Sequence, residues 1–257
     1  MTLGSSGSLW IVVGGVFLLA GLVKGAIGMG LPTVAMGLLA VTMPSAEAAA
    51  MLLIPSFVTN VWQLFAGASL GTLSRRFWAM MIGIVVGTVS GAGLLTGSHS
   101  LITRGALGVA LVLYAAFGLS SVRISIRRGS EIWLSPAIGI LTGLVTGATG
   151  VFVIPAVPYL QALDLDRESL IQALGLSFTV STIALAGGLL QHGAIAASSP
   201  LLLVSLLSLV PALLGMLAGQ HLRARMAADT FRRAFFIGLV LLGLYLAIEG
   251  FGGRDLT

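Results

Sequence analysis

The chain has 257 residues, of which 57% are hydrophobic and 8% are charged, whereas soluble domains carry about 25% charged residues. The mean hydropathy of +1.09 and apolar runs that reach the ~20 residues needed to cross a bilayer indicate an all-α polytopic membrane protein with no soluble domain. The absence of cysteine excludes disulfides and thiolate metal sites. The net charge of +5 comes from basic residues between apolar runs, which is typical of membrane topology and does not indicate nucleic-acid binding.

Eight apolar blocks follow one another, and the first and fifth are longer than the others. The blocks are 9–43, 46–70, 77–97, 101–122, 132–162, 169–191, 200–219 and 231–250. A glycine-rich phrase divides block one into arms 9–23 and 31–43, which span only ~20 Å each at 1.5 Å per residue, against ~30 Å of hydrocarbon. We therefore expect blocks one and five to be glycine-broken helical hairpins, re-entrant or crossing as short pairs. The other six blocks are expected to be transmembrane helices.

The two long blocks contain nearly the same phrase. "GLVKGAIG" occupies 21–28 and "GLVTGATG" occupies 143–150. The similarity continues beyond the phrases, because Pro32 aligns with Pro155 and Asn60 with Ser181. This internal duplication predicts two repeats, 1–128 and 129–257, within one membrane domain.

The basic residues predict how the repeats are oriented. Arg75 and Arg76 lie between blocks two and three, but the equivalent loop after block six has no lysine or arginine. In the second half the basic cluster is instead at 223–233, after block seven. Equivalent loops are therefore expected on opposite sides of the membrane, which predicts inverted-topology repeats with both termini outside.

The glycine phrases are candidates for an anion site. A helix break at membrane depth needs protein or water to satisfy its backbone, and the amides at the start of the second arm attract anions. We expect the two phrases to meet near the midplane, where Lys24 contributes a charge and Thr146 a hydroxyl group. The candidate residues are Lys24, Gly25, Gly28, Met29, Gly30, Thr146, Gly147, Thr149 and Gly150. The alternatives are close helix packing for the glycines and snorkelling to an interface for Lys24.

Polar side chains follow in blocks two and six. In block two they recur at i, i+3, i+4 and i+7, which places them on one face of a helix. Uncharged donors of this kind suit an oxyanion that must be released again, and the alternative is interhelical hydrogen bonding. The candidate residues are Ser56, Thr59, Asn60, Gln63, Ser177 and Ser181.

The sequence gives no support for an enzyme. It contains no nucleophile–base pair, phosphate-binding loop, dinucleotide fingerprint or metal-ligand spacing. Glu47 and Glu168 each stand at the start of a block, where a carboxylate suits the helix dipole. We therefore expect no catalytic residues, no metal and no cofactor.

At these residues the chain resembles the TauE/SafE family of sulfite-exporter-type permeases. The resemblance covers nearly the whole chain and is strongest at "GLVKGAIGMGLPTVAMGLL", "PSFVTNVWQ" and "GLVTGATGVFVIP". It implies export of sulfite or a small organosulfonate from the cytoplasm through the inner membrane of a bacterium. The expected partners are thus a small inorganic or organosulfonate anion and the lipid bilayer, with a homodimer left open. A channel or carrier for another small anion and a non-transporting scaffold or assembly factor are the alternatives.

The predicted topology can be tested with single cysteines, since the parent chain has none. Cysteines at Ser5, Ser98 and Ser199 should react with an impermeant maleimide from outside the cell. Those at Arg127 and Arg225 should react only from inside. If the positions at 127 and 225 lie on opposite faces, the two hairpins do not return to their starting side.

Overall fold

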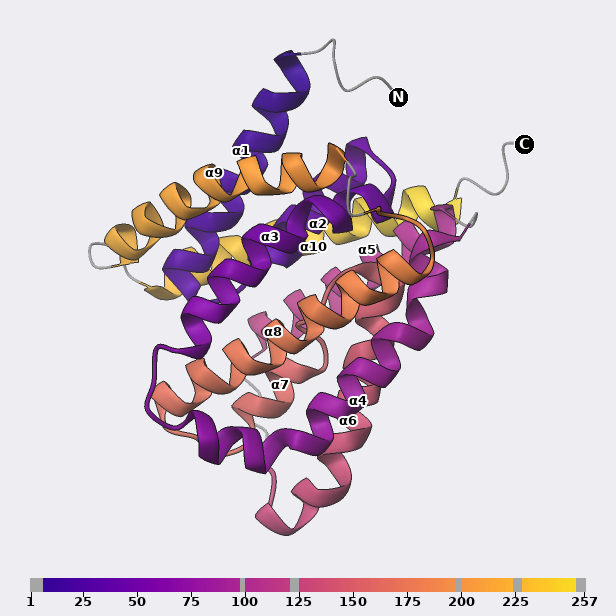
Figure 1. Cartoon of the computed structure of the whole chain (residues 1–257). Coiled ribbons are helices and arrows are strands. Elements are labelled where there is room, and N and C mark those ends of the chain that lie inside the picture. Colours follow the sequence, from indigo (N-terminus) through magenta and orange to yellow (C-terminus); the bar gives the residue numbers. More distant parts are fainter. Residues whose placement is uncertain (1–6, 98–99, 121–124, 197–199, 224–227, 253–257) are drawn as a thin grey trace.

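The protein is a bundle of helices in the computed structural model, which describes residues 7–97, 100–120, 125–196, 200–223 and 228–252 (Figure 1). The first half contains α1 (Gly7–Ile27), α2 (Leu31–Thr42), α3 (Ser45–Leu64), α4 (Leu70–Thr96) and α5 (Ser100–Leu119). The second half contains the 3-10 turn η1 (Arg128–Ser130), α6 (Glu131–Thr149), α7 (Ala156–Gln161), α8 (Arg167–Gln191), α9 (Pro200–Arg223) and α10 (Ala228–Gly252). The all-helical fold is confirmed. Ser5, Ser98, Ser199 and Arg225 of the topology prediction lie outside the described residues.

Seven helices of the described ranges are long and apolar enough to cross a membrane. They include α1 and α6, whose 21 and 19 residues correspond to about 31 and 28 Å. The expectation of a short first arm is therefore wrong. Most of each glycine phrase is helical, and only the second arms, α2 and α7, are short, with 12 and 6 residues.

The long helices form two groups of opposite direction, which Figure 1 shows as an upper and a lower layer. In the first group α1, α3 and α9 run the same way. The contacts that fix this order join Leu18 to Gly215, Ala26 to Gly219, Ile54 to Ser205 and Lys24 to Asn60. In the second group α4, α6 and α8 run the same way. Their contacts join Gly83 to Pro136, Gly91 to Gly147, Ser69 to Gln172 and Gly93 to His192.

The two groups meet where α3 packs against α8. Asn60 contacts Thr182, whereas Leu64, further along α3, contacts Gln172, nearer the start of α8. The two helices therefore run in opposite directions. Because α1 and α3 run in the same direction, they start at the same end of the bundle, and the same holds for α6 and α8. The hairpin of α1 and α2 and the hairpin of α6 and α7 therefore each return to the end at which they started, as a re-entrant hairpin requires.

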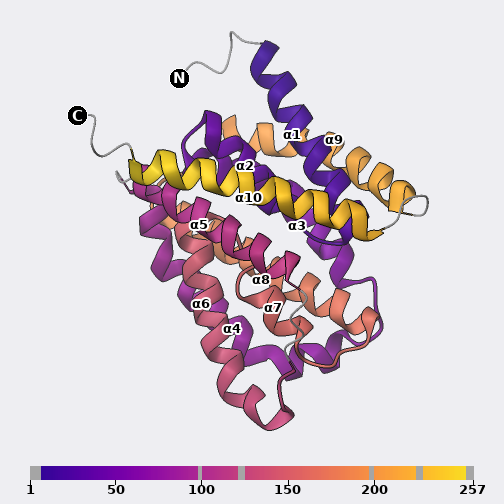
Figure 2. The ribbon, with the colours of Figure 1, turned by 180° about the vertical axis from the view of Figure 1, so that it is seen from behind.

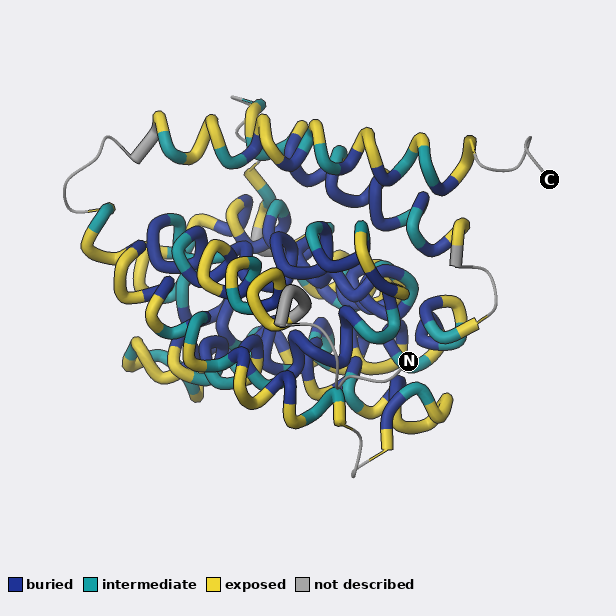
Figure 3. Tube along the Cα trace, turned by 90° about the horizontal axis from the view of Figure 1, so that it is seen from above, coloured by how far each residue is buried: buried dark blue, intermediate teal, exposed yellow. Residues whose placement is uncertain are grey.

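A second antiparallel pair, α5 and α10, lies across the bundle (Figure 2). Gly105 near the start of α5 lies against Phe251 near the end of α10, and Gly118 lies against Phe236. Buried residues concentrate in the interior of the bundle, while exposed ones occupy outward faces (Figure 3). Many of these exposed residues are large and apolar, which suits a surface that faces lipid.

Glycines hold α1 against α9. A Cβ atom on Gly21 would lie 2.1 Å from the carbonyl oxygen of Ala212, and one on Gly25 would lie 2.1 Å from that of Met216. Neither position has room for a side chain, because the obstacle is backbone. The packing interpretation of the first phrase therefore holds for these two glycines.

The second half makes the same contacts between α6 and α4. A Cβ atom on Gly143 would lie 2.3 Å from the carbonyl oxygen of Ile84, and one on Gly147 would lie 2.4 Å from that of Thr88. These contacts match those of Gly21 and Gly25 position for position. They make Thr88 of α4 the counterpart of Met216 in α9.

We expect Gly143→Ala to destabilise the protein, because the added methyl group meets backbone atoms of α4. Overpacking of this kind costs about 1–3 kcal/mol, so the melting temperature should fall by roughly 5 °C. Gly14→Ala is the matched control, since a Cβ atom there meets nothing within 4 Å. Equal melting temperatures for the two variants would show that glycine does not set the spacing of α4 and α6.

Candidate functional site

Lys24 is the only lysine of the chain, and its side chain is 4% exposed. It lies in the last turn of α1, where the carbonyl end of the helix favours a cation. The ammonium group donates a hydrogen bond to Oδ1 of Asn60 on α3. Ion pairs within the described ranges join Arg76 to Glu131 and Arg104 to Glu249, so the buried lysine has no carboxylate partner among them.

Asn60 bonds to Lys24 on one side and to α8, a helix of the second group, on the other. Its Nδ2 atom donates to Oγ1 of Thr182 on α8 at 3.3 Å, and the Thr182 hydroxyl donates to the carbonyl oxygen of Phe178 at 2.7 Å. Three helices are thus joined through polar side chains. The side-chain amide of Asn60 thus accepts one hydrogen bond through Oδ1 and donates another through Nδ2. The ammonium group of Lys24 has three N–H donors, and one of them is used in the bond to Asn60.

The polar stripe of α3 is buried along its whole length. Thr59 donates to the carbonyl oxygen of Pro55 at 2.7 Å, and Gln63 donates from Nε2 to the carbonyl oxygen of Ile171 at 3.1 Å. By contrast, Oγ of Ser56 and Oε1 of Gln63 have no hydrogen-bond partner. Some polar atoms of the stripe therefore bond to a neighbouring helix, as Nε2 of Gln63 does. Others, such as Oγ of Ser56, have no partner among the described residues.

The predicted residues of α8 are also buried. Ser177 and Ser181 are fully buried, and neither hydroxyl oxygen has a hydrogen-bond partner. Buried polar groups without partners cost free energy in a folded protein. Together with Ser56 they form a set of buried hydroxyl groups on the two helices that also carry Asn60 and Thr182.

The helix that carries the first phrase ends at Ile27, one residue before the end of the phrase. Gly28 and Gly30 have φ angles of 87° and 107°, which favour glycine. The amide of Gly28 donates to the carbonyl oxygen of Lys24 at 2.7 Å, and α2 begins at Leu31. Between the two glycines, Sδ of Met29 accepts a hydrogen bond from Tyr114 at 3.1 Å. Lys24 therefore lies one turn before the break, on the preceding helix.

The second phrase also ends at a glycine with left-handed backbone, but the helix that follows it starts later than in the first half. Gly150 has a φ angle of 72°, and its amide donates to the carbonyl oxygen of Thr146 at 2.7 Å. Residues 151–155 are then not helical, and α7 begins only at Ala156. The expectation of two equivalent helix starts is therefore wrong, because Val151, Phe152 and Val153 pack in the apolar core instead.

The threonines of this second phrase are buried and are bonded within their own helix. The Thr146 hydroxyl donates to the carbonyl oxygen of Thr142 at 2.7 Å. The Thr149 hydroxyl donates to that of Val145 at 2.7 Å and accepts from the amide of Val151 at 3.2 Å. No hydrogen bond in the described ranges joins Thr146 to Lys24.

Sequence reasoning missed two buried hydroxyl groups. Oγ1 of Thr88 on α4 and Oγ1 of Thr142 on α6 are fully buried and have no partner. Each threonine stands beside a glycine, Thr88 after Gly87 and Thr142 before Gly143. The available signal was the alignment of the two halves, in which Thr142 directly precedes the second phrase where Ala20 precedes the first.

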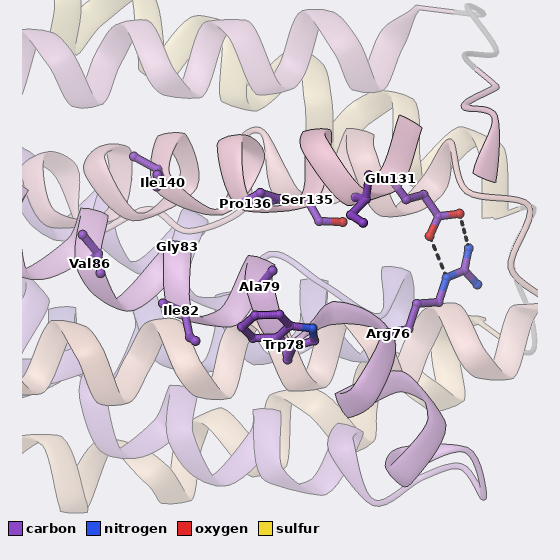
Figure 4. Close-up of a pocket in the computed structure, with 11 residues that line it drawn as sticks. Arg76, Trp78, Ala79, Ile82, Gly83, Val86, Glu131, Ser135, Pro136 and Ile140 are labelled. Atoms are coloured by element: carbon purple, nitrogen blue, oxygen red, sulfur yellow. Dashed lines mark hydrogen bonds and ion pairs between the residues drawn. The ribbon is translucent and has the colours of Figure 1, made fainter. Parts of the chain in front are cut away.

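A surface hollow lies elsewhere in the bundle. It measures about 700 Å³ and lies between α4 and α6 on their outward side, with Trp78, Ile82 and Ile140 in its lining (Figure 4). At one end Arg76 and Glu131 form a two-pronged ion pair with N–O distances of 2.6 and 2.8 Å. Lys24 is not among its lining residues. The described ranges contain no group of three histidine, aspartate or glutamate side chains that could hold a metal.

Comparison with known proteins identifies the family. The family model described as sulfite exporter TauE/SafE matches residues 13–246. No curated protein and no solved structure gave a match. The matched range takes in both glycine phrases, the stripe of α3 and the helices that surround Lys24. The chain therefore belongs to the TauE/SafE family of sulfite exporters, and is a multi-pass membrane transporter for sulfur anions.

Proposed function

We propose that this protein exports a small sulfur oxyanion, sulfite or a small organosulfonate, from the cytoplasm and binds it at Lys24. The observation that carries the proposal is a buried ammonium group, on the only lysine of the chain, that has no carboxylate partner in the described ranges. Charges inside the membrane are costly and generally functional. A bound anion would supply the missing counter-charge.

The surroundings of Lys24 suit an oxyanion. Ser56 on α3 and Ser177 and Ser181 on α8 carry buried hydroxyl groups that have no partner among the described residues, and Asn60 bonds both to Lys24 and to Thr182 of α8. Hydroxyl groups donate to anionic oxygens without adding charge, and hydrogen bonds to a charged group are the stronger ones. The amides at the start of α2, which follow Gly28, Met29 and Gly30, add partial positive charge from the same region.

A single positive charge permits release as well as binding. Charge pairs strengthen steeply where the dielectric constant is low, so two lysines would hold a dianion too tightly for turnover. In the second half Thr146 stands where Lys24 stands in the first. The site therefore combines one cation with neutral donors.

The interface between α3 and α8 is where the group of α1, α3 and α9 could move relative to the group of α4, α6 and α8. Within each group glycines bring backbones into contact, whereas the groups meet at α3 and α8 through hydrogen bonds such as that from Asn60 to Thr182. Equivalent contacts in the two halves support an inverted repeat, a common basis of alternating access. Rocking at this plane would expose Lys24 to each side in turn.

The direction of transport follows from the membrane potential. Each negative charge is driven outward by about 2.3 kcal/mol per 100 mV, and a dianion by twice as much. Export therefore needs no coupled ion. We place the protein in the cytoplasmic membrane of a bacterium with both termini outside, in agreement with its basic loops.

Lys24→Met should weaken sulfite binding to the purified protein by about tenfold or more, the equivalent of the 1.5–3 kcal/mol of a charged hydrogen bond. Lys24→Arg should restore binding only in part, because a planar guanidinium does not replace a compact ammonium. Isothermal titration with sulfite, sulfate, thiosulfate and a small sulfonate gives both affinity and preference. Arg75→Met, which removes an exposed cation, is the control for net charge. Parental affinity in Lys24→Met would place the substrate elsewhere.

Asn60→Asp should stabilise the protein and block its function. The new carboxylate would pair with Lys24 and take the place of the anion, so sulfite binding and flux in liposomes should fall by about tenfold or more while the melting temperature rises. Asn60→Thr is the uncharged control and should retain measurable flux. Full sulfite binding by Asn60→Asp contradicts the proposed site.

A further inference from the structure

The hollow between α4 and α6 opens on the outward side of the bundle. Its walls are large, exposed apolar side chains of both helices, namely Trp78, Ile82, Val86, Ile132 and Ile140. Gly83 and Pro136 also line it, and here the two backbones are in contact, since a Cβ atom on Gly83 would lie 2.7 Å from the carbonyl oxygen of Pro136. The hollow is therefore a groove along the seam of two membrane helices. We call it the α4–α6 groove.

The α4–α6 groove has the depth of one lipid leaflet. Its lining on α4 extends from Arg76 to Val86, which corresponds to a helix rise of about 15 Å. The hydrocarbon of a bilayer is about 30 Å thick, so one leaflet accounts for half of it. The ion pair of Arg76 and Glu131 stands at one end, and Val86 and Ile140 stand at the other (Figure 4). Both helices begin at the Arg76 end, so the groove runs from the membrane surface toward the midplane.

Two tryptophans mark the Arg76 end as the level of the membrane surface. Trp78 and Trp133 each follow a member of the ion pair by two residues, and their side chains are 62% and 80% exposed. Tryptophan gathers where the hydrocarbon meets the lipid headgroups. Arg75 and Arg127 are exposed at the same end. We therefore expect this end on the cytoplasmic side, where basic residues accumulate.

The ion pair leaves donors of Arg76 available to a headgroup. Glu131 accepts hydrogen bonds from Nε and Nη2 at 2.8 and 2.6 Å, whereas a guanidinium group has five N–H donors. Within the described ranges Arg76 makes no other hydrogen bond, and its side chain is 28% exposed. Glu131 thus orients the guanidinium group without using all of its donors. A planar fork of N–H groups held in this way suits a phosphate.

We propose that the α4–α6 groove binds an anionic phospholipid of the cytoplasmic leaflet, with its phosphate at Arg76 and one acyl chain along Ala79 and Gly83. The ion pair is neutral as a whole, and Arg75 and Arg127 add positive charge near it. Basic pockets between membrane helices on the cytoplasmic side are typical sites for anionic lipid headgroups. Lys24 is not in the lining, so this lipid site does not depend on the proposed function.

Native mass spectrometry of the protein purified in detergent tests the lipid site, because it reports bound lipids and the oligomeric state together. Phosphatidylglycerol should bind at least about fivefold more tightly than phosphatidylcholine with the same chains, the effect of one basic side chain on an anionic lipid. Ala79→Phe fills the groove and should weaken phosphatidylglycerol binding by about tenfold or more, because the acyl chain loses its buried surface. Ala137→Phe is the matched control, since it adds the same ring at an exposed position of α6 outside the lining.

The two members of the ion pair separate recognition of the headgroup from stability of the fold. Arg76→Gln should lower the preference for phosphatidylglycerol. Glu131→Gln should raise it by about fivefold, because the charge of Arg76 is then no longer compensated. If the pair only stabilises the fold, the two variants should weaken lipid binding alike, and that result would overturn the proposal.

Other occupants of the groove give different results. Equal binding of the two lipids by the parent, or parental binding by Ala79→Phe, would overturn the proposal. Inorganic phosphate should not raise the melting temperature as phosphatidylglycerol does, and an equal rise would show that no acyl chain is needed. A dimer that Ala79→Phe dissociates would assign the groove to a second copy of the chain and overturn the lipid site. Lys24→Met should bind phosphatidylglycerol as the parent does.

Discussion

The arrangement of this bundle depends on one buried ammonium group that has no counter-ion among the described residues. A charged side chain buried among membrane helices is costly, and the hydrogen bond from Lys24 to Asn60 offsets only part of that cost. The position at the carbonyl end of α1 adds some stabilisation. In the proposed function a bound anion would offset the remaining deficit, and it could use hydroxyl groups of α3 and α8 that have no partner among the described residues.

The two kinds of helix contact have different mechanical consequences. Glycines in α1, α9, α4 and α6 bring backbones together with no side chain between them, so each group should move as a unit. The contact of α3 with α8 is polar and specific, with Asn60 bonded to Thr182 and Gln172 bonded to the carbonyl oxygens of Leu64 and Gly67. A few exchangeable hydrogen bonds at this plane are easier to rearrange than interlocked backbones. Substrate at Lys24 would lie at the boundary that moves.

The sequence predicted an all-helical membrane protein, because long hydrophobic runs are a strong local signal. It misplaced the helix break, since glycines at 21 and 25 serve packing and only Gly28 and Gly30 adopt left-handed backbone. It also missed Thr88 and Thr142, because an unpaired hydroxyl group is a property of packing between α4, α6 and α8. The late start of α7 follows from apolar residues 151–153 being drawn into the core, which the similarity of the two phrases concealed.

Selenite, a heavier analogue of sulfite, offers the most direct test of where the anion binds. Anomalous scattering from selenium in crystals of the protein soaked with selenite would locate it without reference to any mutant. The account predicts a strong selenium peak beside the Lys24 ammonium group, between α1, α3 and α8, placed so that a selenite oxygen accepts its hydrogen bond, and this peak should disappear in crystals of Lys24→Met. A selenium peak in another part of the bundle, with none beside Lys24, would contradict it.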